Sequence, residues 1–225
     1  MDLGLQGHVA LVIGGAGYIG SAVVGRLRAE GATALSAGRR SGDVRVDAAD
    51  DASLASAVES VVAEHGRLDV VVVTAAPAAQ TLDPALANDP AAVLTAIDGK
   101  AMTFLRAANA ALPHMRDAGY GRIIGISGQN ALLTGDLRAS IRNAALILAA
   151  ENLADAYAGS GVTINVVNPA RVKDEPAPDV EPGRGGDSSP TQIADLIAFL
   201  ASPLAAAVSG ESIAIGHRVC GVTHL

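Results

Sequence analysis

Apolar and polar positions follow two patterns that alternate along the chain. Short runs that are apolar at nearly every position are separated by longer segments in which apolar residues recur every three or four positions. The first pattern is typical of strands buried on both faces, and the second of helices that cover a sheet. The short runs predict seven strands, at residues 8–14, 32–38, 43–47, 68–74, 121–127, 162–168 and 211–216.

The longer segments predict the helices that connect these strands. Asp51 and either Ser189 or Pro190 are typical residues for the start of a helix. Strands that alternate with helices indicate a parallel sheet covered on both faces, which is the doubly wound α/β class. The predicted helices lie at residues 18–30, 51–65, 95–117, 138–159 and 190–202.

Length and composition limit the number of domains. The chain has 225 residues, of which half are apolar. That is enough for one substantial core but not for two full domains, so we expect a single domain over residues 1–225. With no tryptophan, three tyrosines and two phenylalanines, the core must consist of Ala, Val, Leu and Ile, whose small side chains permit close packing of helices on a sheet.

Charge excludes some classes of partner. The net charge is −7, and the arginines are scattered rather than gathered into a basic stripe, so we expect no nucleic-acid partner. The single cysteine, Cys220, excludes an internal disulfide and a thiolate metal cluster. We interpret it as a small buried residue in a reducing compartment, and we expect no metal site.

Hydropathy gives no sign of a membrane segment. No uninterrupted apolar stretch approaches the length of a bilayer span, and the start of the sequence lacks a basic segment followed by a long apolar run. We therefore expect a soluble, cytoplasmic protein with no membrane partner.

One segment, residues 173–190, differs in composition from the rest. It reads KDEPAPDVEPGRGGDSSP, rich in Pro, Gly, Asp and Ser, which predicts a mobile surface loop. Because it follows the carboxyl end of a strand, it is a candidate lid over a ligand crevice. A disordered insertion without a role is equally compatible with the composition.

A glycine-rich turn joins the first predicted strand to the first predicted helix. In GGAGYIG, the residues Gly14, Gly17 and Gly20 are spaced three apart. Such glycines let the turn close, let a backbone approach a pyrophosphate and let the helix pack on its strand. Together with Ile19 they are the predicted phosphate-binding residues. A turn that needs glycine only for packing is the alternative.

The ends of the next two strands are expected to select the nucleotide. An acid after the second strand would accept hydrogen bonds from a ribose, whereas an arginine would pair with a 2′-phosphate. The chain has Arg39 and Arg40 there, which favours NADP(H); two solvated arginines are the alternative. Asp47, after the third strand, is placed to meet the adenine amino group, or else it caps the following helix.

Six segments in order along the chain resemble the short-chain dehydrogenase/reductase family. The resemblance covers nearly the whole chain and implies a Rossmann-like sheet, NAD(H) or NADP(H), and oxidation or reduction of a carbonyl or alcohol. It also implies a homodimer or homotetramer formed through helices 95–117 and 138–159. The segments are GHVALVIGGAGYIG, GRLDVVVVTAA, AALPHMRDAGYGRIIGIS, NAALILAAENLA, GVTINVVNPARV and SGESIAIG.

All four catalytic positions of that family are changed in this chain. The family's serine aligns with Gly128, although Ser127 is adjacent and could substitute through a local shift. Its tyrosine and lysine align with Ala139 and Asn143, and its asparagine aligns with Lys100. The resemblance therefore implies the scaffold of a reductase without the usual reacting groups.

The missing tyrosine matters most, because carbonyl reduction needs a proton donor. Loss of a positioned acid typically costs about 10²- to 10⁴-fold in rate. We expect none of the three tyrosines, Tyr18, Tyr120 and Tyr157, on the facing side of the crevice. An ordinary reductase mechanism is therefore disfavoured.

Other cofactor-side positions depart from the family as well. The threonine before the first glycine is Ile13, and the signature after the fourth strand reads VTAA, in which Ala75 is a predicted cofactor contact. A usual hydroxyl near the pyrophosphate falls close to Asp174. Because an anion is a poor neighbour for a pyrophosphate, this change argues against NADP(H) binding in the family's pose.

Polar residues at the expected strand ends still indicate a ligand site. The predicted catalytic residues are Lys100, Gln129, Asn130 and Asn143, and the predicted ligand is a small molecule. Lys100 is a base, an electrophile or an anion anchor, or else a structural link to backbone carbonyls. Gln129 and Asn130 alternatively cap their loop. Arg171 binds a substrate carboxylate, or else it pairs with the acidic loop.

Three functions fit these observations. The first is non-redox chemistry on a small metabolite in a biosynthetic pathway, such as isomerisation, elimination or cyclisation. The second is an NADPH-dependent carbonyl oxidoreductase with an atypical site. The third is a catalytically inactive subunit. We favour the first narrowly over the second, because fold alone does not fix function.

Overall fold

A parallel sheet of seven strands forms the centre of the molecule. The computed structural model describes residues 2–76, 83–182 and 184–219. All neighbouring strands of the sheet are parallel, in the order β3-β2-β1-β4-β5-β6-β9. Each predicted strand is present, which confirms the doubly wound α/β class. The strands are β1 (Val9–Ile13), β2 (Thr33–Gly38), β3 (Val44–Arg45), β4 (Val70–Val73), β5 (Gly121–Ile126), β6 (Val162–Pro169) and β9 (Ser212–Ile215).

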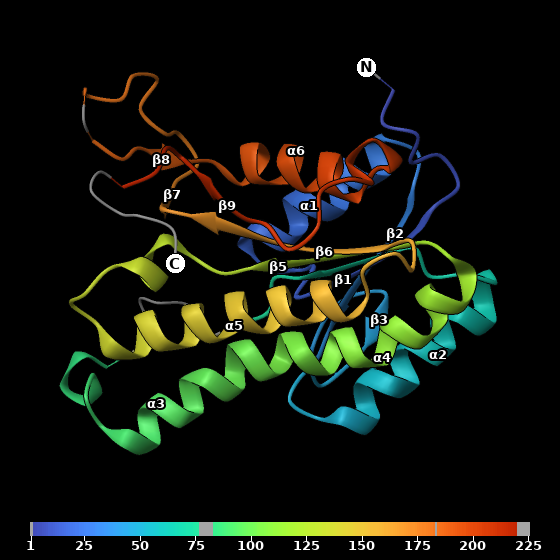
Figure 1. Ribbon diagram of the computed structural model, residues 1–225, viewed down its shortest axis with the longest axis horizontal. Coiled ribbons are helices and arrows are strands. Elements are labelled where there is room, and N and C mark those ends of the chain that lie inside the picture. Colours follow the sequence, from blue (N-terminus) through green and yellow to red (C-terminus); the bar gives the residue numbers. More distant parts are fainter. Residues whose placement is uncertain (1, 77–82, 183, 220–225) are drawn as a thin grey trace.

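Helices cover the two faces of this sheet in separate layers. Figure 1 shows α1 (Tyr18–Ala29) and α6 (Pro190–Ala201) on one face and α2 (Asp51–His65), α4 (Thr103–Ala118) and α5 (Leu137–Ala156) on the other. Alternate side chains of a strand point to opposite faces, so β2, β1, β4, β5 and β6 each contribute to both cores. Full burial of β1 and β4 explains why their sequences are apolar at every position.

Helix starts agree with the sequence at both α2 and α6. Ser189 caps α6 in a capping box with Gln192, and Pro190 is the first helical residue. Helix α2 starts at Asp51 as predicted, and its N-cap is Asp50, whose carboxylate accepts from the Ser53 backbone N–H. Asp47 is therefore not the cap of this helix.

The predicted helix over residues 95–117 is in fact three consecutive segments. They are α3 (Pro90–Ile97), a π-helical turn η3 (Asp98–Met102) and α4. Asp89 caps α3 by accepting from the Ala92 N–H, so the helical region starts five residues earlier than predicted. π-helical turns within helices occur frequently at functional sites, and this one carries Lys100.

The base of the predicted loop at residues 173–190 is held by a short second sheet. Strands β7 (Arg171–Val172) and β8 (Asp187–Ser188) pair in parallel, and an ion pair joins Lys173 to Asp187. Mobility of the loop, and its closure as a lid, stay predictions. Short 3-10 turns complete the chain: η2 (Pro84–Leu86), η4 (Gln129–Leu132) and η5 (Pro203–Ala205).

Two further expectations concern a membrane segment and the burial of Cys220. Within the described residues, no helix combines the length and the hydropathy that a membrane crossing requires. Cys220 lies outside the described residues, so its expected burial is not tested.

Candidate functional site

A cavity of about 1140 Å³ lies at the carboxyl ends of the central strands. It begins at the glycine turn between β1 and α1, passes the ends of β2 and β4, and reaches η3 and α5. This is the position at which open α/β sheets bind ligands. Three of the four predicted catalytic residues border the cavity, and so do most of the predicted cofactor contacts.

The glycine turn forms one end of the cavity. Gly14 has φ +84°, and a Cβ there would lie 2.7 Å from the Ala75 N atom. A Cβ on Gly20 would lie 2.2 Å from the Gly14 carbonyl oxygen. Packing alone thus explains glycine at these two positions. All three predicted glycines, with Ile19 and Ala75, also border the cavity. Phosphate binding at this turn is compatible with the packing explanation and stays a prediction.

Of the three residues predicted to select the nucleotide, two border the cavity and one does not. Arg39 and Asp47 border it, whereas Arg40 is exposed and lies outside the lining. The Asp43 carboxylate, between β2 and β3, accepts from the backbone N–H and the hydroxyl of Ser36. These bonds hold the pKa of Asp43 below its usual value. The end of β2 therefore presents an arginine and not an acid to the cavity.

Lys100 lies at the opposite end of the cavity, on the π-helical turn. Its side chain is 7% exposed, and its Nζ atom donates to the Ser127 carbonyl oxygen at 3.0 Å. Burial first, and the charge of Arg142 second, lower its pKa to about 7. The structural link to a backbone carbonyl is thus present, and the same amine borders the cavity. An amine that titrates near neutral pH can both accept and donate a proton.

The other positions that the resemblance aligns with the family's catalytic residues lie after β5 and on α5. Ala139 is buried and does not border the cavity, whereas Asn143, one turn further along α5, is 3% exposed and does. A Cβ on Gly128 would lie 3.3 Å from the Asn143 Nδ2 atom, so these two changed positions face each other. Ser127 donates its hydroxyl to the Asn143 carbonyl at 3.0 Å. This bond anchors α5 and occupies the hydroxyl proton that a substitute for the family's serine would need.

The two predicted amides of η4 have different positions. Gln129 donates to the carbonyl oxygens of Ile215 and His217 and accepts from the Val219 N–H. It does not border the cavity, so the structure gives it the loop-capping position and not the catalytic position predicted for it. Asn130 is exposed and borders the cavity.

Arg142 is a residue of the site that sequence reasoning missed. It is 4% exposed and borders the cavity beside Asn143. Burial lowers its pKa, although an arginine stays charged at neutral pH. The available signal was its position directly before Asn143, in a helix segment where the family's catalytic pair aligns.

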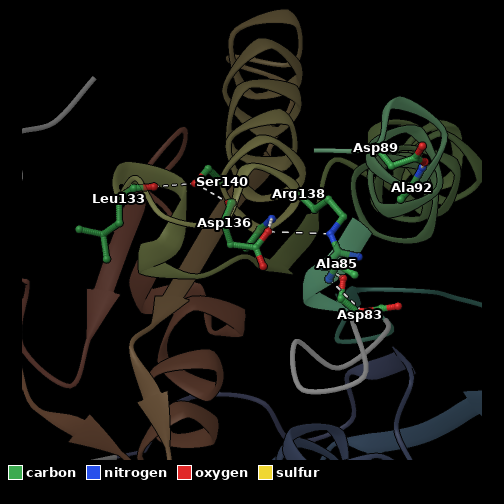
Figure 2. Close-up of polar contacts among 9 residues, drawn as sticks. Asp83, Ala85, Asp89, Ala92, Leu133, Asp136, Arg138 and Ser140 are labelled. Atoms are coloured by element: carbon green, nitrogen blue, oxygen red, sulfur yellow. Dashed lines mark hydrogen bonds and ion pairs between the residues drawn. The ribbon is translucent and has the colours of Figure 1, made fainter. Parts of the chain in front are cut away.

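Arg138, one turn before Arg142, points to a different part of the fold. Figure 2 shows its guanidinium turned toward Asp83, whose carbonyl oxygen accepts from Nη2 at 2.6 Å. Its Nε lies 4.0 Å from the Asp136 carboxylate, which caps α5 by accepting from the Ala139 N–H. Arg138 therefore joins the start of α5 to the segment before η2.

One of the three tyrosines, Tyr18 in the glycine turn, borders the cavity. Tyr18 borders the cavity, and its hydroxyl donates to the Asp174 carboxylate at 2.8 Å. This bond raises the pKa of Tyr18 and gives Asp174 a partner at the mouth of the cavity. Tyr18 borders the cavity from the glycine turn, and the expectation that no tyrosine lies on the facing side of the crevice stays a prediction. Arg171 is exposed and borders the cavity, and no ion pair joins it to the described part of the acidic loop.

No group of three or more His, Cys, Asp or Glu residues that could hold a metal ion occurs in residues 2–76, 83–182 and 184–219. The arrangement instead offers backbone and arginine at one end and buried amine, guanidinium and amide at the other. These are groups that bind anions and move protons.

Comparisons with known proteins agree with this architecture. Residues 14–217 match the family described as Enoyl-(Acyl carrier protein) reductase. D-threitol dehydrogenase of Mycolicibacterium smegmatis is 31% identical, over 95% of this chain and 93% of that protein. Cis-4-hydroxycyclohexanecarboxylate dehydrogenase of Sinomonas cyclohexanicum is also 31% identical, over 92% of this chain and 94% of that protein.

A solved structure gives the same result for the fold. A short-chain type dehydrogenase/reductase from Mycobacterium ulcerans superposes with a TM-score of 0.82 at 23% identity, covering 98% of this chain and 93% of that one. Sequence, sheet order and cavity position therefore agree: the chain belongs to the short-chain dehydrogenase/reductase family.

Proposed function

We propose that this protein is an enzyme that transfers a proton within a small carbonyl metabolite, with Lys100 as its acid–base group and without net oxidation or reduction. The observation that carries the proposal is the Lys100 amine, buried in the cavity with a pKa of about 7. It stands beside a helix on which the family's phenol position is a methyl group, Ala139.

The reaction that suits this amine is an isomerisation. Neutral Lys100 accepts a proton from the carbon next to a carbonyl group, and the resulting ammonium returns it to another atom of the same molecule. One C–H bond breaks and one C–H or O–H bond forms, so protons and electrons balance without an external oxidant or reductant. Asn143 and Asn130 are the polar side chains placed to orient the substrate, because both border the cavity.

The residues present fit the adenosine and pyrophosphate parts of NADP(H). Gly14 and Gly20 leave no room for a Cβ, and Arg39 rather than an acid borders the cavity at the end of β2. Bound NADP(H) would supply hydride chemistry. The chain's own residues would hold its phosphates at the glycine turn and at Arg39. In the proposed reaction this end of the cavity serves for binding alone.

A second function, NADPH-dependent carbonyl reduction, is favoured by one specific observation. The cavity runs without interruption from the glycine turn to Lys100, and the relatives named above are dehydrogenases. In that reaction the Lys100 ammonium would donate the proton in place of the family's phenol.

Proton exchange separates these two functions. Small ketones and 2-hydroxy ketones are incubated with the protein in D₂O, and loss of the C–H signal next to the carbonyl is followed by NMR. We expect exchange without NADPH, and about a 10²- to 10⁴-fold slower exchange in Lys100→Met. Lys173→Met is the matched control, since the chain has only these two lysines. Consumption of NADPH without exchange would replace the first function by the second.

We also propose that copies of the chain associate through α4 and α5 as a homodimer or homotetramer in the cytoplasm. Leu148, in the middle of α5, is 57% exposed, and a large apolar side chain at such a position suits a helix interface. Light scattering should give a multiple of 22.4 kDa for the wild type and the single-chain mass for Leu148→Asp.

A further inference from the structure

One buried oxygen atom at the inner end of the cavity has no hydrogen-bond donor. Asn143, on α5, is 3% exposed and borders the cavity. Its Oδ1 atom accepts no hydrogen bond from the described residues. A buried amide oxygen without a donor costs free energy, and nearly all such groups in folded proteins are satisfied. A ligand that donates a hydrogen bond to this oxygen would remove the cost.

Gly128 leaves space beside this amide. A Cβ on Gly128 would lie 3.3 Å from the Asn143 Nδ2 atom and 3.7 Å from the Pro169 carbonyl oxygen. All three residues border the cavity. The φ angle of Gly128 is 172°, an extended conformation that any residue adopts. The backbone therefore does not require glycine here, and the missing side chain leaves room for a small ligand group next to the amide.

A ligand at this amide also lies near the Lys100 amine. Lys100 donates from Nζ to the Ser127 carbonyl oxygen, and the Ser127 hydroxyl donates to the Asn143 carbonyl oxygen, both at 3.0 Å. Ser127 thus joins the amine to the residue that carries the unpartnered oxygen. Since Lys100 and Asn143 both border the cavity, we expect one small molecule to contact both through neighbouring atoms.

The charges at this end of the cavity favour a neutral donor. Arg142 is close enough for its charge to lower the pKa of Lys100. The guanidinium and the protonated amine would repel a ligand that carries an ammonium group. A hydroxyl group is uncharged and small, and it has one O–H to donate. It is therefore the group that suits the Asn143 oxygen.

We propose that the substrate is a small 2-hydroxy ketone or 2-hydroxy aldehyde, whose hydroxyl donates to Asn143 Oδ1 while the carbon that bears it lies against Lys100. Asn143 then determines specificity, because an analogue without the hydroxyl leaves the buried oxygen unpaired. The identity of the reacting carbon rests on the proposed function, whereas the contact between the hydroxyl and Asn143 does not.

Titration of the wild type with three ketones, followed by ligand NMR at pH 7, tests the inference. Hydroxyacetone carries the hydroxyl. Butan-2-one has a methyl group in its place, and methoxyacetone keeps the oxygen but cannot donate. We expect hydroxyacetone to bind about 10- to 100-fold more tightly than either of the other two. This comparison needs no variant, so it does not depend on how a substitution affects folding.

A substitution on α5 then assigns the contact. Asn143→Leu should lower the affinity for hydroxyacetone to that for butan-2-one without weakening butan-2-one. A purely structural role of Asn143 would instead weaken both ketones equally. The matched control is Asn152→Leu, because Asn152 is an exposed asparagine of the same helix and lies outside the lining. This variant should keep the full preference for hydroxyacetone.

Four results would overturn the proposal. They are no saturation by hydroxyacetone, equal affinities for hydroxyacetone and butan-2-one, equal affinities for hydroxyacetone and methoxyacetone, and equal losses for both ketones in Asn143→Leu. The third result would mean that the protein donates to the ligand oxygen and does not accept from it.

The side-chain amide of Asn143 gives a second readout. In protein with ¹⁵N-labelled asparagine, its signal is identified by its loss in Asn143→Leu. Hydroxyacetone should shift this signal, and butan-2-one should not. If NADPH shifts it and excludes hydroxyacetone, the oxygen is satisfied by the nucleotide and the proposal is wrong.

Failure of this inference can be told from failure of the proposed function. If hydroxyacetone is preferred through Asn143 but no C–H exchange occurs in D₂O, the proposed function fails and the hydroxyl contact stands. If hydroxyacetone and butan-2-one exchange with equal kcat/KM, the proposed function stands and the inference fails.

Discussion

The two ends of one cavity differ in what the chain has kept. At the glycine turn, Gly14, Gly17 and Gly20 retain the spacing of the family, and Arg39 borders the cavity. At the other end, near η3 and α5, the sequence resemblance aligns the family's reacting groups with Lys100, Gly128, Ala139 and Asn143. If that alignment holds, the comparison teaches that the binding surface of a scaffold can persist while its reacting groups are replaced.

The physical reason lies in which atoms do the work. The glycine end acts through backbone geometry, and a side chain there would collide with the Ala75 backbone or the Gly14 carbonyl. The α5 end acts through side chains, which can be exchanged without altering the course of the helix. Changes at the first end should therefore affect the fold, and changes at the second should affect charge and protonation.

The largest effect on stability is expected from Lys100, on η3 at the end of the cavity opposite the glycine turn. An unfolded lysine keeps its proton up to about pH 10.5, whereas the folded pKa of about 7 means that the folded amine is neutral above that value. The unfolded state thus binds more protons between these values, so the free energy of unfolding rises with pH across this window. Below pH 7 the full cost of burying the charge remains.

Lys100→Met removes this dependence. At pH 7 or below, the variant should be more stable than the wild type by up to about 4 kcal/mol, and the difference should shrink toward pH 10. Urea unfolding of both proteins from pH 6 to pH 10 measures this difference in the free energy of unfolding, with Lys173→Met as the control. Parallel pH profiles for the wild type and Lys100→Met would show that the amine is hydrated in solution.

The next effect concerns the glycine end. A Cβ on Gly20 would lie 2.2 Å from the Gly14 carbonyl oxygen, whereas a Cβ on Gly25, in the same helix, would meet nothing within 4 Å. We expect Gly20→Ala to lower the free energy of unfolding by about 2 to 3 kcal/mol. Gly25→Ala should raise it by up to about 1 kcal/mol, because alanine favours the helix. Urea unfolding of the two variants measures both changes. Similar stabilities for Gly20→Ala and Gly25→Ala would contradict the argument that packing requires glycine in the turn.

The sequence predicted the glycine end of the cavity better than the end that holds Lys100, because only the glycine end has a local sequence signature. Strands such as β4, with four consecutive buried valines, and the glycine turn have local signatures that mark them directly. The π-helical turn has no such signature, since it arises where α3 runs into α4. The start of α3, marked by Asp89 and Pro90, was overlooked.

Side-chain direction was equally hidden in the sequence. Gln129 and Asn130 are adjacent amides, but only Asn130 borders the cavity, because the C-terminal segment accepts and donates the hydrogen bonds of Gln129. Arg142 was missed because its role depends on Lys100, which lies 42 positions away in sequence and meets it only in the folded chain.

A smaller effect should distinguish two adjacent arginines at the glycine end. Arg39 borders the cavity and Arg40 does not, so Arg39→Ala should weaken NADPH binding by about tenfold, or about 1.4 kcal/mol, and leave NADH binding unchanged. Arg40→Ala should change either affinity less. Fluorescence titration with both nucleotides measures the four values. Equal losses for NADPH and NADH would mean that Arg39 does not contact a 2′-phosphate.

The smallest effect is expected at the glycine end, from the hydrogen bond between Tyr18 and Asp174. This bond joins the glycine turn to the segment after β7 at 2.8 Å, and both side chains are exposed. An exposed polar contact contributes little to global stability, so Tyr18→Phe should change the free energy of unfolding by less than about 0.5 kcal/mol. Amide exchange near Asp174 should nevertheless become faster, because local opening is measured separately from global unfolding. Tyr157→Phe, at the far end of α5, is the control and should leave that exchange unchanged. If Tyr18→Phe also leaves it unchanged, the predicted lid is not held by this bond, and the glycine turn and the loop move independently.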